Sequence, residues 1–348
     1  MADSSPAAIP IFDGHNDALT REDGAAFASG RAGGHLDLRR ARAGGLAGGI
    51  FAVFTASPDA DPAPGPRDDG GHEVAPAAPI GPDVAAPAAT RAAGRLLALE
   101  RAGHVRVMRA AGDLDAALAH GVLAAVLHLE GAEAIDPGLE ALELWHAAGL
   151  RSLGPVWSRE NAFGHGVPFA FPASPDTGPG LTAAGRALVR RCAELGIAVD
   201  LSHLNEAGFW DVARLDCAPL VASHSAVHAL SPQTRNLTDA QLDAIGASGG
   251  VVGIVFAVKF LRADGADDAD TPLATLAEHA RYVAERIGPE HVALGSDFDG
   301  ATIPAELGDA SGLPRVLDAL RVAGFDEREL RAIAWDNWRR VLERAWTG

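Results

Sequence analysis

The sequence predicts a single-domain (β/α)8 barrel of the TIM type over residues 1–348. Eight short apolar runs bounded by Gly or Pro recur along the chain, and most precede a stretch with helical spacing, which is typical of βα units around a parallel sheet. Runs such as residues 122–129 and 250–256 are apolar on both faces, as expected of strands between covering helices and a packed interior. The length admits one barrel, because α/β barrels reach about 250 residues or more as one domain. An eight-stranded barrel therefore fits better than an open sheet.

Each apolar run is predicted to be one barrel strand. The eight strands cover residues 9–13, 49–55, 123–130, 151–157, 197–203, 220–224, 251–256 and 292–297. Four segments between them have the spacing of helices, namely residues 183–195, 239–247, 273–287 and 313–323. Thr182, Thr238 and Thr271 precede three of these helices and are predicted to cap them, because a side-chain oxygen there can accept from an unpaired backbone N–H.

Two segments rich in Pro and Gly depart from this alternation, residues 56–90 and residues 169–180. Such composition is most common in linkers. Both segments, however, follow predicted strands two and four, and loops after the carboxyl ends of barrel strands form the active-site mouth. We therefore expect two long loops that form walls or lids of a cleft.

The composition predicts a soluble globular protein. Lys and Arg total 29 and Asp and Glu total 46, so the formal net charge of −17 opposes binding to nucleic acid, whose phosphates are bound by Lys and Arg. Cys192 and Cys217 are too few for a disulfide framework and are expected to be buried thiols. No signal-peptide pattern and no run of roughly 18 uncharged apolar residues is present. We expect a cytoplasmic protein without a membrane anchor.

Side chains with metal-binding chemistry lie at the ends of several predicted strands. His15 and Asp17 are two residues apart and project to the same side of an extended chain. Four more runs end on Glu130, His203, His224 and Asp297. Taken singly, His-x-Asp is more simply a surface turn, and each of the others a hydrogen-bonded core residue. Six of them at one edge of one barrel instead indicate a divalent-metal site, since buried charges need partners and metals take these ligands.

Six short motifs follow one another along the chain and are specific when taken together. They are Asp-Gly-His-Asn-Asp (13–17), Leu-Glu-Gly (129–131), Val-Asp-Leu-Ser-His (199–203), Ala-Ser-His-Ser (222–225), Arg-Asn-Leu-Thr-Asp (235–239) and Gly-Ser-Asp-Phe-Asp-Gly (295–300). From about residue 9 to residue 345, the chain resembles the renal (membrane) dipeptidase family, peptidase family M19 of the amidohydrolase superfamily. That resemblance implies a zinc-dependent dipeptidase with a barrel of the metal-dependent hydrolase type.

The resemblance also implies the roles of individual residues. His15 and Asp17 would bind one Zn²⁺, His203 and His224 a second, and Glu130 would bridge the two. Arg235 and Asp297 would contact the substrate.

The residue types suit hydrolysis of the peptide bond of a free dipeptide. Two divalent ions roughly 3.5–4 Å apart can share a water or hydroxide, lower its pKa and polarise the scissile carbonyl. Asp297 would accept the proton of the attacking water and pass it to the leaving amine. Arg235 would pair bidentately with the free carboxylate of a short peptide, which would favour dipeptides over long chains.

Two positions depart from the vertebrate-type relatives. Trp157 stands where those enzymes carry a substrate-facing His, and Ala257 stands where they carry a Tyr. An indole cannot act towards an oxyanion as an imidazole does. The departures therefore concern the substrate pocket, which Trp157 is expected to line, and leave the metal ligands intact.

Other polar and aromatic residues are given simpler roles. His128 is predicted to be a hydrogen-bonded core residue, with support of the metal ligands as the alternative. His165 and His228 are predicted to be loop residues, and Trp335 and Trp338, which have helical spacing, to be core packing.

Two rival functions stay open beside the dipeptidase. In one, the same barrel and metals act on another small amide, a lactam or an N-acyl amino acid. In the other, the chain is a non-catalytic binding protein, against which a complete ligand set with a base argues. The expected partner is a small-molecule dipeptide, and a homodimer is left open.

Overall fold

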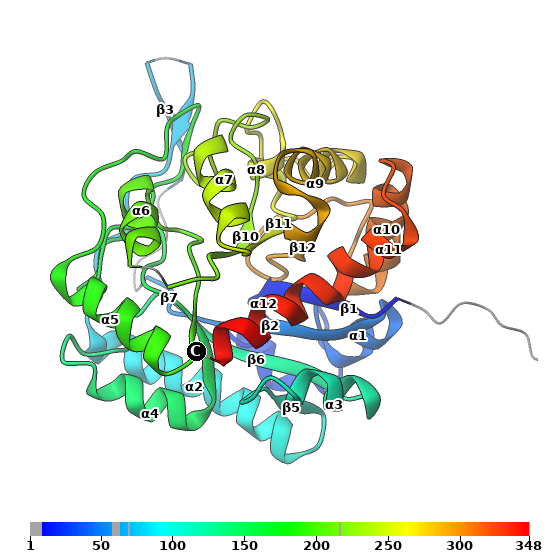
Figure 1. The fold of residues 1–348 in the computed structure, drawn as a ribbon, viewed down its shortest axis with the longest axis horizontal. Coiled ribbons are helices and arrows are strands. Elements are labelled where there is room, and N and C mark those ends of the chain that lie inside the picture. The colour runs from blue at the N-terminus through cyan, green and yellow to red at the C-terminus, as the bar shows by residue number, and fades with distance from the viewer. Residues whose placement is uncertain (1–8, 58–62, 69, 216, 348) are drawn as a thin grey trace, which may run out of the picture.

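Strands form the centre of the computed structural model, and helices lie around them (Figure 1). The structure describes residues 9–57, 63–68, 70–215 and 217–347. All eight predicted strands are confirmed, the third with its predicted bounds and the others with shifted ends, as β1 (Ile11–Asn16), β2 (Leu46–Phe54), β6 (Leu123–Glu130), β7 (Leu150–Gly154), β9 (Ala198–Val199), β10 (Val221–Ser225), β11 (Val251–Val255) and β12 (Val292–Gly295). The strands β9 and β12 end before His203 and Asp297, whose φ angles of 69° and 57° are incompatible with extended backbone.

The predicted parallel α/β architecture is confirmed, but its hydrogen-bond ladder divides into two sheets. One sheet has the order β1-β2-β6-β7-β9, with an unpredicted strand, β5 (Val105–Val107), beside β6. The other sheet has the order β10-β11-β12. Single parallel bridges link the two sheets at both seams, between Asp200 and Val221 and between Asn16 and Phe298.

A buried aspartate explains the interruption of the ladder at each seam. The Oδ1 atom of Asp200 accepts from the backbone N of Ser223 at 2.8 Å, and the Oδ1 atom of Asp13 accepts from the backbone N of Ser296 at 2.7 Å. These carboxylates take backbone donors that would otherwise pair with a neighbouring strand. Both seams therefore carry polar side chains at the strand ends.

Helices connect most of the strands. They are α1 (Leu38–Ala43), α2 (Pro82–Arg101), α3 (Asp113–Ala119), α4 (Glu140–Ala148), α5 (Ala183–Glu194), α6 (Glu206–Arg214), α7 (Asp239–Ala247), α8 (Val258–Leu261), α9 (Leu273–Ile287), α10 (Leu313–Val322), α11 (Glu327–Arg331) and α12 (Asn337–Trp346). The four predicted helices are confirmed as α5, α7, α9 and α10. None of the helices in the described ranges combines the length and apolar character needed to cross a bilayer.

Two of the three predicted helix caps are confirmed. The Thr182 side chain accepts from the backbone N of Gly185, and Thr238 forms a reciprocal capping box with Gln241. The prediction for Thr271 was wrong, because α9 begins after Pro272 and the Thr271 hydroxyl donates to the carbonyl of Asp268 at 2.6 Å. That hydroxyl therefore stabilises the loop before the helix and does not cap α9.

The two Pro- and Gly-rich excursions pair with each other. Short strands β3 (Gly65–Pro66), β4 (His72–Glu73) and β8 (Ala170–Phe171) form a three-stranded antiparallel sheet, in which His72 and Glu73 pair with residues 170–171. In Figure 1 this sheet projects from one side of the molecule. The prediction of a loop over residues 56–90 was wrong from Pro82 onward, where α2 begins with a proline in its first turn. Residues 58–62 and 69 of this prediction lie outside the described residues.

One apolar cluster brings side chains of many strands together. It contains residues of seven strands, namely Phe12, Ile50, Ala124, Val126, Ala198, Val221, Val251 and Ala293. Trp335 and Trp338 belong to the same cluster, which confirms them as core residues, and the indole Nε1 of Trp338 donates to the carbonyl of Leu294 at 2.9 Å. Cys192 is buried as predicted, whereas Cys217 is only half-buried because it lies in the loop before β10.

Candidate metal centre

The five predicted metal ligands lie together at the carboxyl ends of the strands. His15 lies in β1 with Asp17 just beyond it, Glu130 is the last residue of β6, His203 follows β9, and His224 lies in β10. All five side chains are buried. A parallel sheet brings the ends of its strands to one edge, so residues far apart in the sequence converge there.

The ligand atoms form two groups that share Glu130. The first group is His15, Asp17 and Glu130, and the second is Glu130, His203 and His224. The Oε1 atom of Glu130 lies 3.5 Å from Nε2 of His15, 2.9 Å from Nε2 of His203 and 3.6 Å from Nε2 of His224. One carboxylate therefore contacts histidines of both groups.

These separations suit ligands of a common metal ion. Two ligands at 2.0–2.1 Å from a tetrahedral ion lie about 3.4 Å from each other. The Nε2 atoms of His203 and His224 are 3.1 Å apart, and Nε2 of His15 is 3.8 Å from Oδ2 of Asp17. Both ring nitrogens of His15 and Oδ1 of Asp17 are buried without a hydrogen-bond partner among the described residues. Buried polar atoms without a hydrogen-bond partner fit a site that holds a cation.

The surroundings lower the pKa of two of the histidines and raise the pKa of the third. Burial and the Arg235 guanidinium lower the pKa of His203 to about 3, and burial together with His15 lowers the pKa of His224 well below its usual value. Both are therefore neutral imidazoles, the form that ligates metals. Burial would also lower the pKa of His15, but the carboxylates of Glu130 and Asp17 raise it well above its usual value. The same carboxylates would attract a bound cation.

Hydrogen bonds orient the second pair of histidines. The Nδ1 atom of His203 lies 2.7 Å from the hydroxyl of Ser158, and Nδ1 of His224 lies 2.8 Å from the hydroxyl of Ser223. With Nδ1 engaged, each ring presents Nε2 towards Glu130, as a ligand requires.

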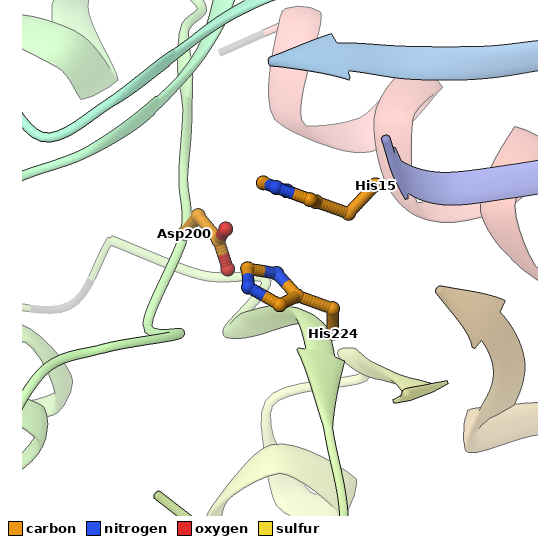
Figure 2. Close-up of side chains that lie close together, drawn as sticks. All are labelled: His15, Asp200 and His224. Carbon is orange, nitrogen blue, oxygen red and sulfur yellow. The ribbon is translucent and has the colours of Figure 1, made fainter. Parts of the chain in front are cut away.

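A third group contains Asp200, a residue that the sequence interpretation missed. Figure 2 shows His15, Asp200 and His224 converging from three elements, and a metal could be held by one atom of each. Asp200 also accepts from the backbone N of Ser202 at 3.1 Å and lies 3.7 Å from Nε2 of His128. Its carboxylate inside the apolar run 197–203 was the signal that could have identified it.

His128 is buried and hydrogen-bonded, as predicted for a core residue. Its Nδ1 lies 2.9 Å from the hydroxyl of Ser152, and its other nitrogen points towards Asp200. His165 and His228 lie in loops as predicted, where each ring contacts a backbone carbonyl, that of Gly180 at 3.2 Å and that of Ala173 at 2.9 Å.

A cavity of about 1050 Å³ opens beside the ligands. Asp17, Glu130, His203 and Asp297 reach it, and so does Trp157. Both excursions also contribute to its lining, through Ala56, Pro64, Val74, Ala75, Pro76, Ala77 and Phe169. The ligand groups therefore lie at the side of a space large enough for a small molecule.

Asp297 lies in this cavity with a perturbed carboxyl group. Removal from water and the nearby Asp17 carboxylate raise its pKa to about 7. Its backbone N donates to the carbonyl of His15 at 3.0 Å, and its φ of 57° lies in the left-handed region. A carboxyl group that titrates near neutrality can both accept and donate a proton.

Arg235 is buried beside the second ligand pair. Its guanidinium donates to the hydroxyl of Ser225 and to the carbonyl of His224, both at 3.0 Å, and its Nε has no partner among the described residues. It does not line the cavity as the structure describes it. Ala257 is buried at the start of α8 and does not line the described cavity either.

The chain is similar to known proteins over nearly its whole length. The family model described as membrane dipeptidase (peptidase family M19) matches residues 5–347. A solved structure described as the dipeptidase AC, a metallo peptidase, is 48% identical, covers 98% of this chain and 99% of its own, and superposes with a TM-score of 0.91. A metallo peptidase from Rhodobacter sphaeroides, liganded with a phosphinate mimic of the dipeptide L-Ala-D-Ala, is also 48% identical. The match covers 97% of this chain and 99% of the relative, with a TM-score of 0.91.

A curated relative extends the likeness to another organism. An uncharacterized protein in the pqqA 5' region of Klebsiella pneumoniae is 52% identical over 245 residues, which are 70% of this chain and 90% of the relative. The family match spans nearly the whole chain. The chain therefore belongs to the membrane dipeptidase family, peptidase family M19.

Proposed function

We propose that this protein is a metal-dependent dipeptidase with two Zn²⁺ ions, one held by His15 and Asp17, the other by His203 and His224, and both by Glu130. The observation that carries the proposal is the shared position of Glu130, whose Oε1 lies within 3.6 Å of all three histidines. The Rhodobacter sphaeroides relative, which was solved with a dipeptide mimic, supports the choice of substrate.

The proposed fold is a closed (β/α)8 barrel that includes the whole chain as one domain. Two observations support closure. Single parallel bridges link the sheets at both seams, and one apolar cluster receives side chains from seven of the strands. A closed barrel would hold the five ligands on a rigid rim.

The proposed mechanism assigns a separate task to each residue. The bound ions would supply a nucleophile at neutral pH and polarise the scissile carbonyl. Asp297 would take the proton of the attacking water and deliver it to the leaving amine, since its carboxyl group lies in the cavity with a pKa near neutrality. The Trp157 indole would contact a substrate side chain, because it lines the cavity beside His203 at a ring separation of 5.8 Å.

Removing the metals is expected to destabilise the fold. Without cations, the buried carboxylates of Asp17 and Glu130 lose their counter-charge, and the described hydrogen bonds do not satisfy His15. Chelation should lower the melting temperature by about 5–10 °C, and zinc should restore it. Calorimetry on the parent, chelated and reloaded protein checks this. An unchanged melting temperature after metal analysis has shown removal would contradict it.

Arg235 is proposed to bind the C-terminal carboxylate of the dipeptide, because a guanidinium offers two parallel donors. Two hydrogen bonds leave three of its five N–H groups for a ligand. Arg235→Met should cost free dipeptides about 2–4 kcal/mol of transition-state binding, on the scale of breaking a buried charge pair. Values of kcat/KM for free dipeptides measure this loss.

Amidated dipeptides are the control for Arg235. They carry no carboxylate, so they should be poor substrates of the parent and little changed by the substitution. A damaged fold would lower both activities. If the parent hydrolysed amidated and free dipeptides equally well, another small amide or an N-acyl amino acid would be the better substrate class.

The rival functions are separated by one panel. Zinc-loaded protein is assayed with dipeptides, including those with a C-terminal D-residue, and with lactams and N-acyl amino acids. The dipeptidase predicts that free dipeptides are hydrolysed fastest. Faster hydrolysis of another amide would favour the alternative amidohydrolase, and no turnover with metals bound would favour the non-catalytic binding protein.

A further inference from the structure

Lys259 is the only lysine in the 348-residue sequence, and its side chain lines the cavity beside the ligand groups. It lies in α8, directly after the carboxyl end of β11. The residue is half-buried. A single ammonium group therefore reaches the space proposed for the substrate.

Four aromatic side chains form a wall of this cavity, and Lys259 lies at one end of it. The rings of Phe54 and Trp157 are 5.0 Å apart, those of Trp157 and Phe169 are 5.6 Å apart, and those of Phe169 and Phe260 are 6.0 Å apart. The Nζ of Lys259 lies 4.9 Å from the centre of the Phe169 ring and 5.1 Å from that of Phe260. The two rings hold the ammonium group at the cavity.

The cation at the other end of the wall already has a partner. Arg159 lies over Phe54 and Trp157, and its Nε donates to a carboxylate oxygen of Glu133 at 2.9 Å. For Lys259, no carboxylate oxygen in the described part of the chain comes within the 4.0 Å of an ion pair. An ammonium group that is half-buried at a cavity, with no counter-ion among the described residues, can bind an anionic group of a ligand.

The position of Arg235 indicates which anionic group this is. The Cζ of Arg235 lies 5.8 Å from the centre of the Phe260 ring, so both cations contact the same ring. If Arg235 holds the main-chain carboxylate, the side chain of the same substrate residue lies near Lys259. We infer that Lys259 is a specificity-determining residue that binds the side-chain carboxylate of an acidic C-terminal residue. This inference rests on the proposed dipeptidase function.

The test compares two substrates that differ only in charge. Ala-Glu and Ala-Gln have nearly the same shape, so the ratio of their kcat/KM values isolates the side-chain carboxylate. The zinc-loaded parent should prefer Ala-Glu, and Lys259→Met should reduce the Ala-Glu to Ala-Gln ratio by about tenfold, as expected for one cavity-facing charge contact. Lys259→Arg, which keeps the charge, should retain most of the preference.

Arg262→Met is the matched control. Arg262 is three residues away and does not line the described cavity, and its Nε pairs with Asp264 at 2.7 Å. Removing its charge should leave the ratio unchanged. A similar fall in both variants would mean that the long-range charge, and not a contact with Lys259, sets the ratio, and would overturn the inference.

Selective labelling gives a second readout. An amine-reactive acetylating reagent can modify only Lys259 and the N-terminal amine, which serves as the internal reference for mass spectrometry. A phosphinate mimic of Ala-Glu should protect Lys259 more strongly than the mimic of Ala-Gln. Equal protection, or a parallel loss of Ala-Glu and Ala-Gln hydrolysis in Lys259→Met, would overturn the inference while the dipeptidase function stands. Failure of the parent to hydrolyse either substrate would overturn both.

Discussion

The Glu130→Gln variant is expected to lose both metal ions and its dipeptidase activity. An amide nitrogen replaces one of the two oxygens of the proposed bridge and cannot ligate a cation. Because Oε1 lies within 3.6 Å of histidines from both groups, one substitution disturbs both sites. Loss of a residue that only supports a ligand costs about 10–100-fold, so loss of the shared ligand should cost more. Elemental analysis and dipeptide hydrolysis on one sample measure the result.

Glu140→Gln is the control for this variant. Glu140 is exposed in the first turn of α4, so the same chemical change there should keep metals and activity. Circular dichroism checks that Glu130→Gln is folded. A folded Glu130→Gln protein with two metal ions and parental turnover would contradict the binuclear mechanism.

Asp297→Asn is expected to keep the metals and to lower kcat by about a hundredfold to ten-thousandfold, the range for loss of a general acid and base. An asparagine has nearly the same shape, so the left-handed backbone at this position, with its φ of 57°, is tolerated. It cannot exchange a proton with the attacking water. Metal content and rate must be measured on the same preparation, and loss of metal in parallel with rate would make Asp297 a ligand.

The pH dependence of kcat/KM is a second test of the proposed acid–base role of Asp297. Asp297 must be ionised to accept a proton, so parental kcat/KM should fall as the pH drops through its pKa. Burial and Asp17 raise that pKa to about 7, and bound cations act in the opposite direction, so the fall should lie at or below neutral pH. The residual activity of Asp297→Asn should lack this acidic limb. An identical limb in both proteins would assign it to another group.

The strands and the polar residues at their ends were predictable because each leaves a local signal. Burial on both sides makes the strands apolar, so a polar residue such as Glu130 at the end of an apolar run marks a site. The contacts of Asp13 and Asp200 were not predictable in the same way. Their partners, Ser296 and Ser223, are remote in the sequence, and only the seams of the sheets bring each pair together.

The helices were harder to predict than the strands. Helix α2 begins inside a segment rich in Pro and Gly, because a proline in the first turn is compatible with a helix although the composition is typical of a loop. Thr271 has the chemistry of a cap, but Pro272 already fixes the first backbone angle before α9 and the hydroxyl bonds within its own loop. Lys259 belongs to none of the sequence motifs, so the position of its ammonium group at the cavity is seen only in the structure.

The most direct test of the central claim is a zinc titration of the metal-free protein, followed by hydrolysis of a free dipeptide and by elemental analysis at each point. Two sites that share Glu130 predict that activity rises until two zinc ions are bound per chain and then stays constant. Full activity at one bound ion per chain, or without any, would contradict the account.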